Sequence, residues 1–209
     1  VITLNSADIS QENAQLFNQL IARRVAREPL SQILGVKPFW SLDFKVNSHT
    51  LSPRPDSETL IELALAHFPD TQRPYRILDL GTGSGCLVLT LLHEWPHASA
   101  VAVDCSEKAL EVAQDNALQL KMEQRVQFKQ GNWAQGQTGT FDLVISNPPY
   151  IAQSDMASLM PEVRDYEPAS ALTDGADGLG AYRIICEQAF DLVKDSGALL
   201  FEIGQGQAE

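Results

Sequence analysis

A chain of 209 residues, 44% hydrophobic and 20% charged, is long enough to bury one good core, and its composition is typical of globular proteins. Its net charge of −12 excludes a general basic field of the kind that gathers nucleic acid. Cys86, Cys105 and Cys186 show neither metal-ligand spacing nor an even-numbered disulfide framework. With no signal peptide and no apolar run of membrane-spanning length in view, we expect a reducing, cytoplasmic location.

The first elements that we expect are a helix and a β-hairpin. Apolar residues recur at helical spacing up to about Arg27, after Ser10 as a candidate N-cap. Three arginines near the end of this helix are expected to form a solvated face: Arg23, Arg24 and Arg27. The aromatic and partly alternating residues 39–46 then predict a hairpin or short strand pair.

Strands and helices alternate through the rest of the chain, after a helix that ends near His67. Strands are predicted at 76–80, 98–104, 126–129, 141–146 and 198–203, and helices at 84–94, 106–121 and 181–193. Cys86 and Cys186 lie in apolar helical patterns, which predicts that both are small core residues. Such alternation predicts an α/β fold, a Rossmann-like parallel sheet with helices on both faces.

A glycine-rich turn joins the first of these strands to its helix. The cofactor-binding candidates here are Asp79, Gly81, Thr82, Gly83, Ser84 and Gly85. A dinucleotide fingerprint wants glycine or alanine at the next position, where Cys86 stands. The spacing therefore favours a nucleoside with an amino-acid tail, and Asp104 at the end of the following strand is placed to accept ribose hydroxyls.

A third candidate contact with this ligand follows the third strand. Asn132 and Trp133 lie there, after Gly131, and the Trp133 ring is able to pack on an adenine. Trp133 could equally be an ordinary core residue.

The tetrapeptide Asn147-Pro148-Pro149-Tyr150 closes a buried strand. Two prolines lack the N–H groups that a strand ladder needs, and open α/β sheets place their ligands at this end of their strands. The Asn147 side-chain oxygen and the Pro148 carbonyl can each accept one N–H of a planar NH₂ group, while Tyr150 covers a face. We interpret Asn147, Pro148, Pro149 and Tyr150 as catalytic, with Asn147 also beside the cofactor.

In their order along the chain, these features of residues 75–204 resemble the class I S-adenosylmethionine-dependent methyltransferases. The resemblance implies S-adenosylmethionine as cofactor, S-adenosylhomocysteine as product and no metal. In that superfamily the Asn-Pro-Pro-Tyr motif marks methylation of a planar nitrogen, which is adenine N6, guanine N2 or the side-chain amide of glutamine.

Segments before the sheet narrow the resemblance. Residues 28–35, Phe39-Trp40 and Pro53-Arg54-Pro55-Asp56-Ser57-Glu58 are similar to the PrmC/HemK family, the peptide chain release factor N5-glutamine methyltransferases, as are Glu167-Pro168 and residues 200–204. Ser52 stands where the family usually has an aliphatic residue, and Ser57 where it often has Thr. The resemblance implies that the substrate is the glutamine of the Gly-Gly-Gln motif in class 1 release factors, with no direct nucleic-acid or membrane partner.

The family pattern also divides the chain. Residues 1–35 would be the remainder of an N-terminal helical domain, 36–52 a β-hairpin linker, and 53–209 the S-adenosylmethionine-binding catalytic domain without its C-terminal strands. We expect this sequence to be part of a longer chain, and the protein to be a monomer.

Arg54, Pro55 and Glu58 are predicted to support the substrate pocket. A purely local interpretation stays open, in which Pro55 opens a helix and Arg54 pairs with Glu58.

Three other functions stay open at this point. The first is a methyltransferase for a glutamine of a ribosomal protein, which shares the same core motifs. The second is an amino-methyltransferase acting on nucleic acid, which the acidic balance disfavours. The third is a non-catalytic module that holds the cofactor or a partner protein.

Overall fold

A parallel sheet organises the computed structural model, which describes residues 9–208. Within these residues the sheet has five strands: β3 (Arg76–Leu80), β4 (Ser99–Asp104), β5 (Val126–Gln130), β6 (Phe141–Ser146) and β7 (Val193–Phe201). Their order is β5-β4-β3-β6-β7, and every neighbouring pair is parallel. The predicted α/β fold is confirmed. Because the strand order reverses between β3 and β6, the carboxyl ends of these two strands flank the crevice in which open sheets bind ligands.

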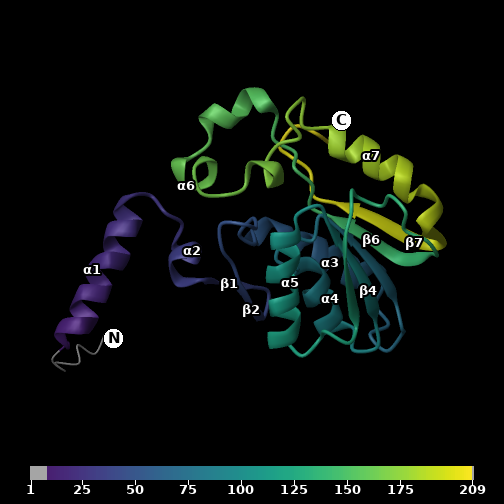
Figure 1. Cartoon of the computed structure of the whole chain (residues 1–209). Coiled ribbons are helices and arrows are strands. Elements are labelled where there is room, and N and C mark those ends of the chain that lie inside the picture. Colours follow the sequence, from purple (N-terminus) through teal and green to yellow (C-terminus); the bar gives the residue numbers. More distant parts are fainter. Residues whose placement is uncertain (1–8, 209) are drawn as a thin grey trace.

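The helices cover both faces of the sheet, and a hairpin precedes it (Figure 1). The helices of the described residues are α1 (Gln11–Val25), α2 (Leu30–Leu34), α3 (Glu58–His67), α4 (Cys86–Glu94), α5 (Glu107–Gln119), α6 (Pro161–Arg164) and α7 (Gly180–Ala189). Short 3₁₀ helices form at Pro55–Ser57, Gln153–Ser158, Ala169–Ala171 and Phe190–Leu192. The expected hairpin consists of the antiparallel strands β1 (Val36–Phe39) and β2 (Leu42–Lys45).

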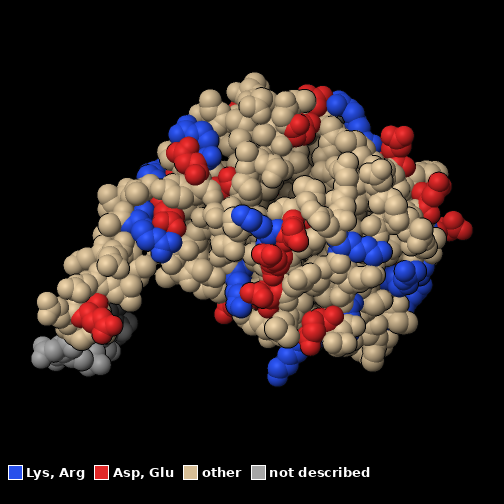
Figure 2. Space-filling view, in the orientation of Figure 1, with Lys and Arg blue, Asp and Glu red and all other residues tan. Residues whose placement is uncertain are grey.

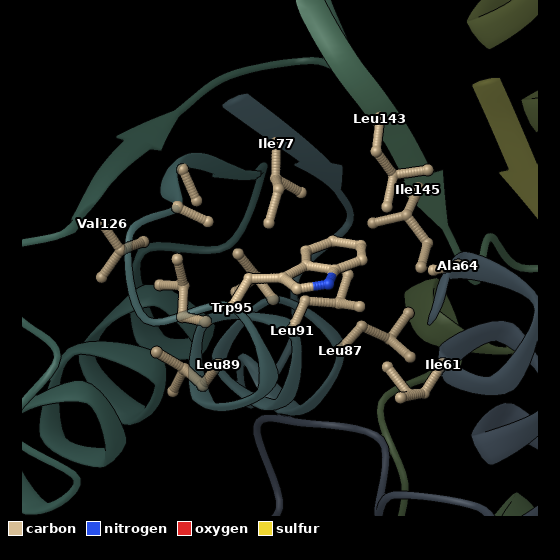
Figure 3. Packing of buried hydrophobic residues seen from close by; sticks show 14 of the residues in the cluster. Ile61, Ala64, Ile77, Leu87, Leu89, Leu91, Trp95, Val126, Leu143 and Ile145 are labelled. Atoms are coloured by element: carbon tan, nitrogen blue, oxygen red, sulfur yellow. The ribbon is translucent and has the colours of Figure 1, made fainter. Parts of the chain in front are cut away.

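Alternation along the strands divides the core between the two faces. Ile77 faces the larger cluster, which also holds residues of α3, α4 and the hairpin, whereas Leu78 faces a smaller cluster under α7. Trp95 is fully buried in the larger cluster, among Leu91 and Leu87 of α4 and Ile77 of β3 (Figure 3). This packing fixes the strand ends from which the glycine loop and the Asn-Pro-Pro-Tyr turn begin.

Helix α1 extends away from the sheet (Figure 1) and buries none of its residues. Ser10 caps it as expected, since its side chain accepts a hydrogen bond from the Asn13 N–H. The arginines near its end are exposed, but they do more than meet solvent. Arg24 and Arg27 pair with Glu162 of α6 at 3.2 and 2.7 Å, so they connect α1 to a distant segment.

Three local predictions were wrong. The helix predicted at 181–193 ends at Ala189, and the strand predicted at 198–203 begins already at Val193. Cys186 is exposed on the outer side of α7 rather than buried, because the inner side of that helix is occupied by Ala181, Ile185 and Ala189. The helix predicted from residue 84 begins at Cys86, since Gly85 precedes it in a left-handed conformation with φ of 80°.

Candidate active site

A cavity with about 1010 Å³ of empty space lies at the carboxyl ends of β3, β4 and β6. Of the residues predicted from sequence, those that line it are Arg54, Gly81, Thr82, Gly83, Ser84, Asp104, Asn132, Trp133, Asn147 and Pro149. Asp79, Gly85, Pro148, Tyr150, Pro55 and Glu58 are not among its lining residues.

The glycine loop is held against the neighbouring strand by its own backbone. The N–H groups of Gly81 and Thr82 both donate to the Val103 carbonyl, at 2.8 and 3.0 Å. Gly81 has φ of 73°, and a Cβ added there would lie 3.2 Å from the Trp133 ring. Glycine at this position therefore keeps the floor of the cavity open and lets backbone approach a ligand closely.

Asp104 connects the glycine loop to the start of α5. One carboxylate oxygen accepts the Gly83 N–H and the other accepts the Ser106 N–H, both at 2.9 Å. Each oxygen keeps a further lone pair, and the residue lines the cavity, so a ribose hydroxyl can still donate to it.

Trp133 lies between the cavity and the core. Its side chain is half-buried, lines the cavity and packs against the smaller core cluster. Its φ of 54° is unusual for a residue with a side chain, and with the adjacent Asn132 it forms the wall beyond β5.

Asp79 lies beneath the cavity rather than in its wall. Its side chain is buried and accepts a hydrogen bond from the Thr82 hydroxyl at 2.6 Å. Burial raises the pKa of Asp79 from 3.8 to about 7, and the Thr82 hydrogen bond opposes that shift only in part. Thr82 itself faces the cavity, so Asp79 supports the loop from below.

The raised pKa of Asp79 predicts a pH-dependent loss of stability. Below about pH 4 this group is protonated in both the folded and unfolded chains; between about pH 4 and 7 only the unfolded chain loses its proton readily. The free energy of unfolding should therefore fall across this range. In the Asp79→Asn variant, whose amide carries no charge, urea unfolding at about pH 5 and 7 should show a smaller fall.

Asp142 offers a matched control, since it is another buried aspartate on a strand. Although burial alone raises its pKa, the hydrogen bonds from Lys194 and the Arg76 N–H outweigh burial and lower it. Its stabilising contribution is lost only at acid pH, so Asp142→Asn should destabilise the protein about equally at both pH values. An Asp79→Asn variant with the same pH profile as the wild type would contradict the assignment.

The Asn-Pro-Pro-Tyr turn begins where β6 ends. Asn147 is half-buried, and its Nδ2 donates to the Ser57 hydroxyl at 3.0 Å. The Tyr150 hydroxyl donates to Glu202 at 3.1 Å, and the Tyr150 carbonyl accepts from the Gln207 side chain at 3.0 Å. Burial, together with the Glu202 carboxylate, raises the pKa of Tyr150 to about 12, so its hydroxyl stays protonated. Both ends of the turn are thus fixed by side chains from other segments.

A second, mostly apolar pocket adjoins the cavity. It has about 570 Å³ of empty space and is lined by Leu51, Arg54, Asn147, Tyr150, Ile151, Leu159, Val163, Ala171 and Leu172. Asn147 and Arg54 belong to both linings. Asn147 therefore lies where the two spaces meet.

The local pairing of Arg54 with Glu58 does not occur. Arg54 pairs instead with Glu167 at 2.5 Å, while Glu58 accepts the Trp40 backbone N–H at 2.8 Å. Glu58 thus secures the hairpin, and Pro55 opens the 3₁₀ turn before α3. Glu167 also accepts the Ser52 N–H, and although these partners oppose it, burial raises the pKa of Glu167.

Ser57 and Glu202 contact the predicted catalytic residues but were not among the candidates. Both stand in segments that match the family pattern, which was the only signal for them. Across residues 9–208, no group of three or more His, Cys, Asp or Glu side chains is arranged to hold a metal ion. Nor does that part of the chain contain a helix both long and apolar enough to cross a membrane.

A parallel sheet with a glycine loop after β3 and a polar turn after β6 defines a class I methyltransferase fold. The hMettl16 catalytic domain, solved in complex with MAT2A 3'UTR hairpin 1, superposes with a TM-score of 0.65 at 14% identity, over 99% of this chain and 72% of that one. A methyltransferase from Pyrococcus furiosus superposes with a TM-score of 0.58 at 19% identity, over 91% of this chain and 81% of that one. At such identities the likeness shows the fold alone.

The model of the Methyltransferase small domain family matches residues 56–163. Release factor glutamine methyltransferases of Rhodospirillum rubrum and Cereibacter sphaeroides are 46% and 45% identical to this chain, over 100% and 99% of it. The chain belongs to the release factor glutamine methyltransferase family. It spans 63% of the first relative's length and 73% of the second's.

Proposed function

We propose that this protein transfers a methyl group from S-adenosylmethionine to the side-chain amide nitrogen, N5, of the glutamine in the Gly-Gly-Gln motif of class 1 peptide chain release factors. One observation carries the proposal: the Asn147 amide lies at the junction of a cavity with a glycine loop and a second, apolar pocket. A transfer reaction needs two bound reactants whose reacting atoms can meet.

The residues of the larger cavity fit an S-adenosyl group. Gly81 leaves a space that a Cβ would restrict, Asp104 retains acceptor capacity, and Trp133 offers a ring face. Gly81 would let the loop backbone approach the cofactor, Asp104 would bind the ribose, and Trp133 would pack on the adenine. When bound, the cofactor supplies an electrophilic methyl group on sulfur.

The second pocket fits the other reactant. Apart from Arg54, Asn147 and Tyr150 its lining is apolar, which suits an extended peptide with a small polar end. The glutamine amide would reach Asn147 at the junction, and Arg54, held by Glu167, would face the approaching peptide.

The chemistry asked of this chain is mainly positioning. An amide nitrogen is a poor nucleophile, because its lone pair is delocalised into the carbonyl group. The Asn147 side-chain oxygen and the Pro148 carbonyl would each accept one of its N–H groups and so align the nitrogen for in-line attack. Such alignment can contribute on the order of 7 kcal/mol. Both oxygens would also stabilise the positive charge that develops on nitrogen. The N–C bond would form as the methyl–sulfur bond breaks, which leaves a neutral thioether, and the nitrogen would then release one proton to solvent.

The charge distribution favours a protein substrate over nucleic acid. The net charge is −12, and on the face drawn in Figure 2 the Lys and Arg side chains lie in small groups with acidic residues among them. A duplex or hairpin would need a continuous basic surface. We place the reaction in the cytoplasm, with the protein acting as a monomer.

Transfer of labelled methyl tests the proposal directly. Full-length protein and labelled S-adenosylmethionine are incubated with a class 1 release factor, with the same factor carrying Asn in place of the motif glutamine, with ribosomal proteins and with RNA. We expect label on the unaltered release factor alone. Label on a ribosomal protein or on RNA would assign one of the other methyltransferase functions, and no label on any substrate would favour a binding module.

A further inference from the structure

Ser57 lies between two side chains that are distant in the sequence. It is 3% exposed, its hydroxyl donates to the Glu202 carboxylate, and its oxygen accepts a hydrogen bond from Asn147 Nδ2 at 3.0 Å. Ser57 comes from the turn before α3, Asn147 follows β6 and Glu202 follows β7. Three segments thus meet in one chain of hydrogen bonds.

The chemistry of the three groups sets the donor-to-acceptor direction of these hydrogen bonds. The Ser57 hydroxyl donates its single proton to Glu202, so that proton is not available to Asn147. Ser57 can then only accept from Asn147, and the Asn147 amide must turn its NH₂ group toward Ser57. Its oxygen consequently lies on the opposite side, and among residues 9–208 no group donates to it.

Without this direction the amide of Asn147 could rotate by half a turn. The rotated amide would accept from the Ser57 hydroxyl and present its own NH₂ group to the substrate NH₂ group. Two donors would then face each other, and neither substrate hydrogen would have its acceptor on Asn147. The identity of Asn147 therefore does not by itself secure the acceptor that the reaction needs.

We propose that Ser57 and Glu202 are positioning residues that orient the Asn147 amide with its oxygen toward the substrate nitrogen. Glu202 also accepts the Tyr150 hydroxyl at 3.1 Å, so one carboxylate connects to both ends of the Asn-Pro-Pro-Tyr turn. The inference rests on the proposed methylation of an amide and adds the groups that set the polarity of its catalytic turn.

Kinetics of Ser57 variants of the full-length protein test this role. Ser57→Ala should lower kcat for the release factor about 10- to 100-fold, with the KM for the release factor and the affinity for S-adenosylhomocysteine changed by no more than about twofold. Ser57→Thr keeps the hydroxyl and should restore most of kcat. Ser196→Ala, on the exposed opposite end of β7, serves as a matched control without effect.

A double-mutant cycle tests whether Glu202 acts through Ser57. Glu202→Ala should also lower kcat about 10-fold, because the freed Ser57 hydroxyl can then donate to the amide oxygen of Asn147. Combined with Ser57→Ala it should cost less than the sum of the two single losses, because only the loss of the acceptor for the Tyr150 hydroxyl is added. Should Ser57→Ala fail to fold, the Glu202→Ala variant, whose side chain is only half-buried, decides the question by its kcat.

The outcomes separate this inference from the proposed function. A wild-type protein that methylates no release factor would overturn the proposed function and the inference with it. If the wild type is active, full kcat in Ser57→Ala or in Glu202→Ala, equal losses in the Ala and Thr variants, or additive losses in the double variant would overturn the inference alone.

Discussion

Replacing Asn147 with alanine is expected to lower kcat roughly 10³-fold while leaving cofactor affinity nearly unchanged. The variant loses the side-chain oxygen at the junction of the two cavities, so one N–H of the substrate amide has no acceptor and the nitrogen is no longer aligned. The glycine loop and Asp104, which carry most of the cofactor contacts in our proposal, are untouched. A large change in kcat without one in binding is the signature of a group that acts in the transition state.

Single-turnover methylation of a release factor and equilibrium binding of S-adenosylhomocysteine together measure this effect. Gln124→Ala is a suitable control, because it removes an exposed amide beside the start of β5, at the other edge of the sheet. Near-normal turnover in Asn147→Ala would refute the assignment of this residue. Equal losses in turnover and in cofactor affinity would instead make Asn147 a cofactor-binding residue.

Replacing Trp95 with alanine is expected to lower the free energy of unfolding by about 3–5 kcal/mol. Trp95 is fully buried in the larger core cluster, where its ring packs against Phe68 and Tyr75 at centroid distances of 6.1 and 4.9 Å. Removing it leaves a cavity between α4 and the sheet, since the surrounding helices cannot collapse fully (Figure 3). Urea unfolding followed by circular dichroism measures the change.

Two tryptophan variants act as controls for this prediction. Trp95→Phe should cost less, because it keeps a ring and removes an indole N–H that is buried without a hydrogen-bond partner among the described residues. Trp133→Ala should affect stability far less, because that ring is half-exposed at the cavity wall. A Trp95→Ala variant as stable as Trp133→Ala would show that the core is packed differently.

Local pattern was enough to predict most of the sheet. The strand at Arg76–Leu80 is apolar except for Arg76 at its start and Asp79, and the glycines that follow it favour a turn over a strand or a helix. The predicted element boundaries were less accurate where the residues suit both a helix and a strand. Residues 190–193 continue the helical pattern of α7, yet they form a 3₁₀ turn and the start of β7, because Val193 pairs with Phe141 of β6.

The partners of charged side chains were predicted less well than the positions of the strands and the glycine turn. Arg54 and Glu58 are four residues apart, which is the spacing of a helical ion pair, but each binds a partner more than fifteen residues away. Long side chains reach whatever the fold brings near them, and sequence distance carries little information about that. The same reason explains why Arg24 and Arg27 meet Glu162 on α6.

Taken by itself, the sequence determined the class of fold and the chemistry of the turn after β6, because strand period, glycine conformation and the missing proline N–H are properties of neighbouring residues. Only the tertiary structure decided whether the Asn147 side chain presents its donor or its acceptor to a substrate. The acceptor role of Asn147 depends on a serine 90 residues before it and, through that serine, on Glu202, which is 145 residues from Ser57. A carboxamide has a donor and an acceptor at equal reach, so only its neighbours in space can choose between them.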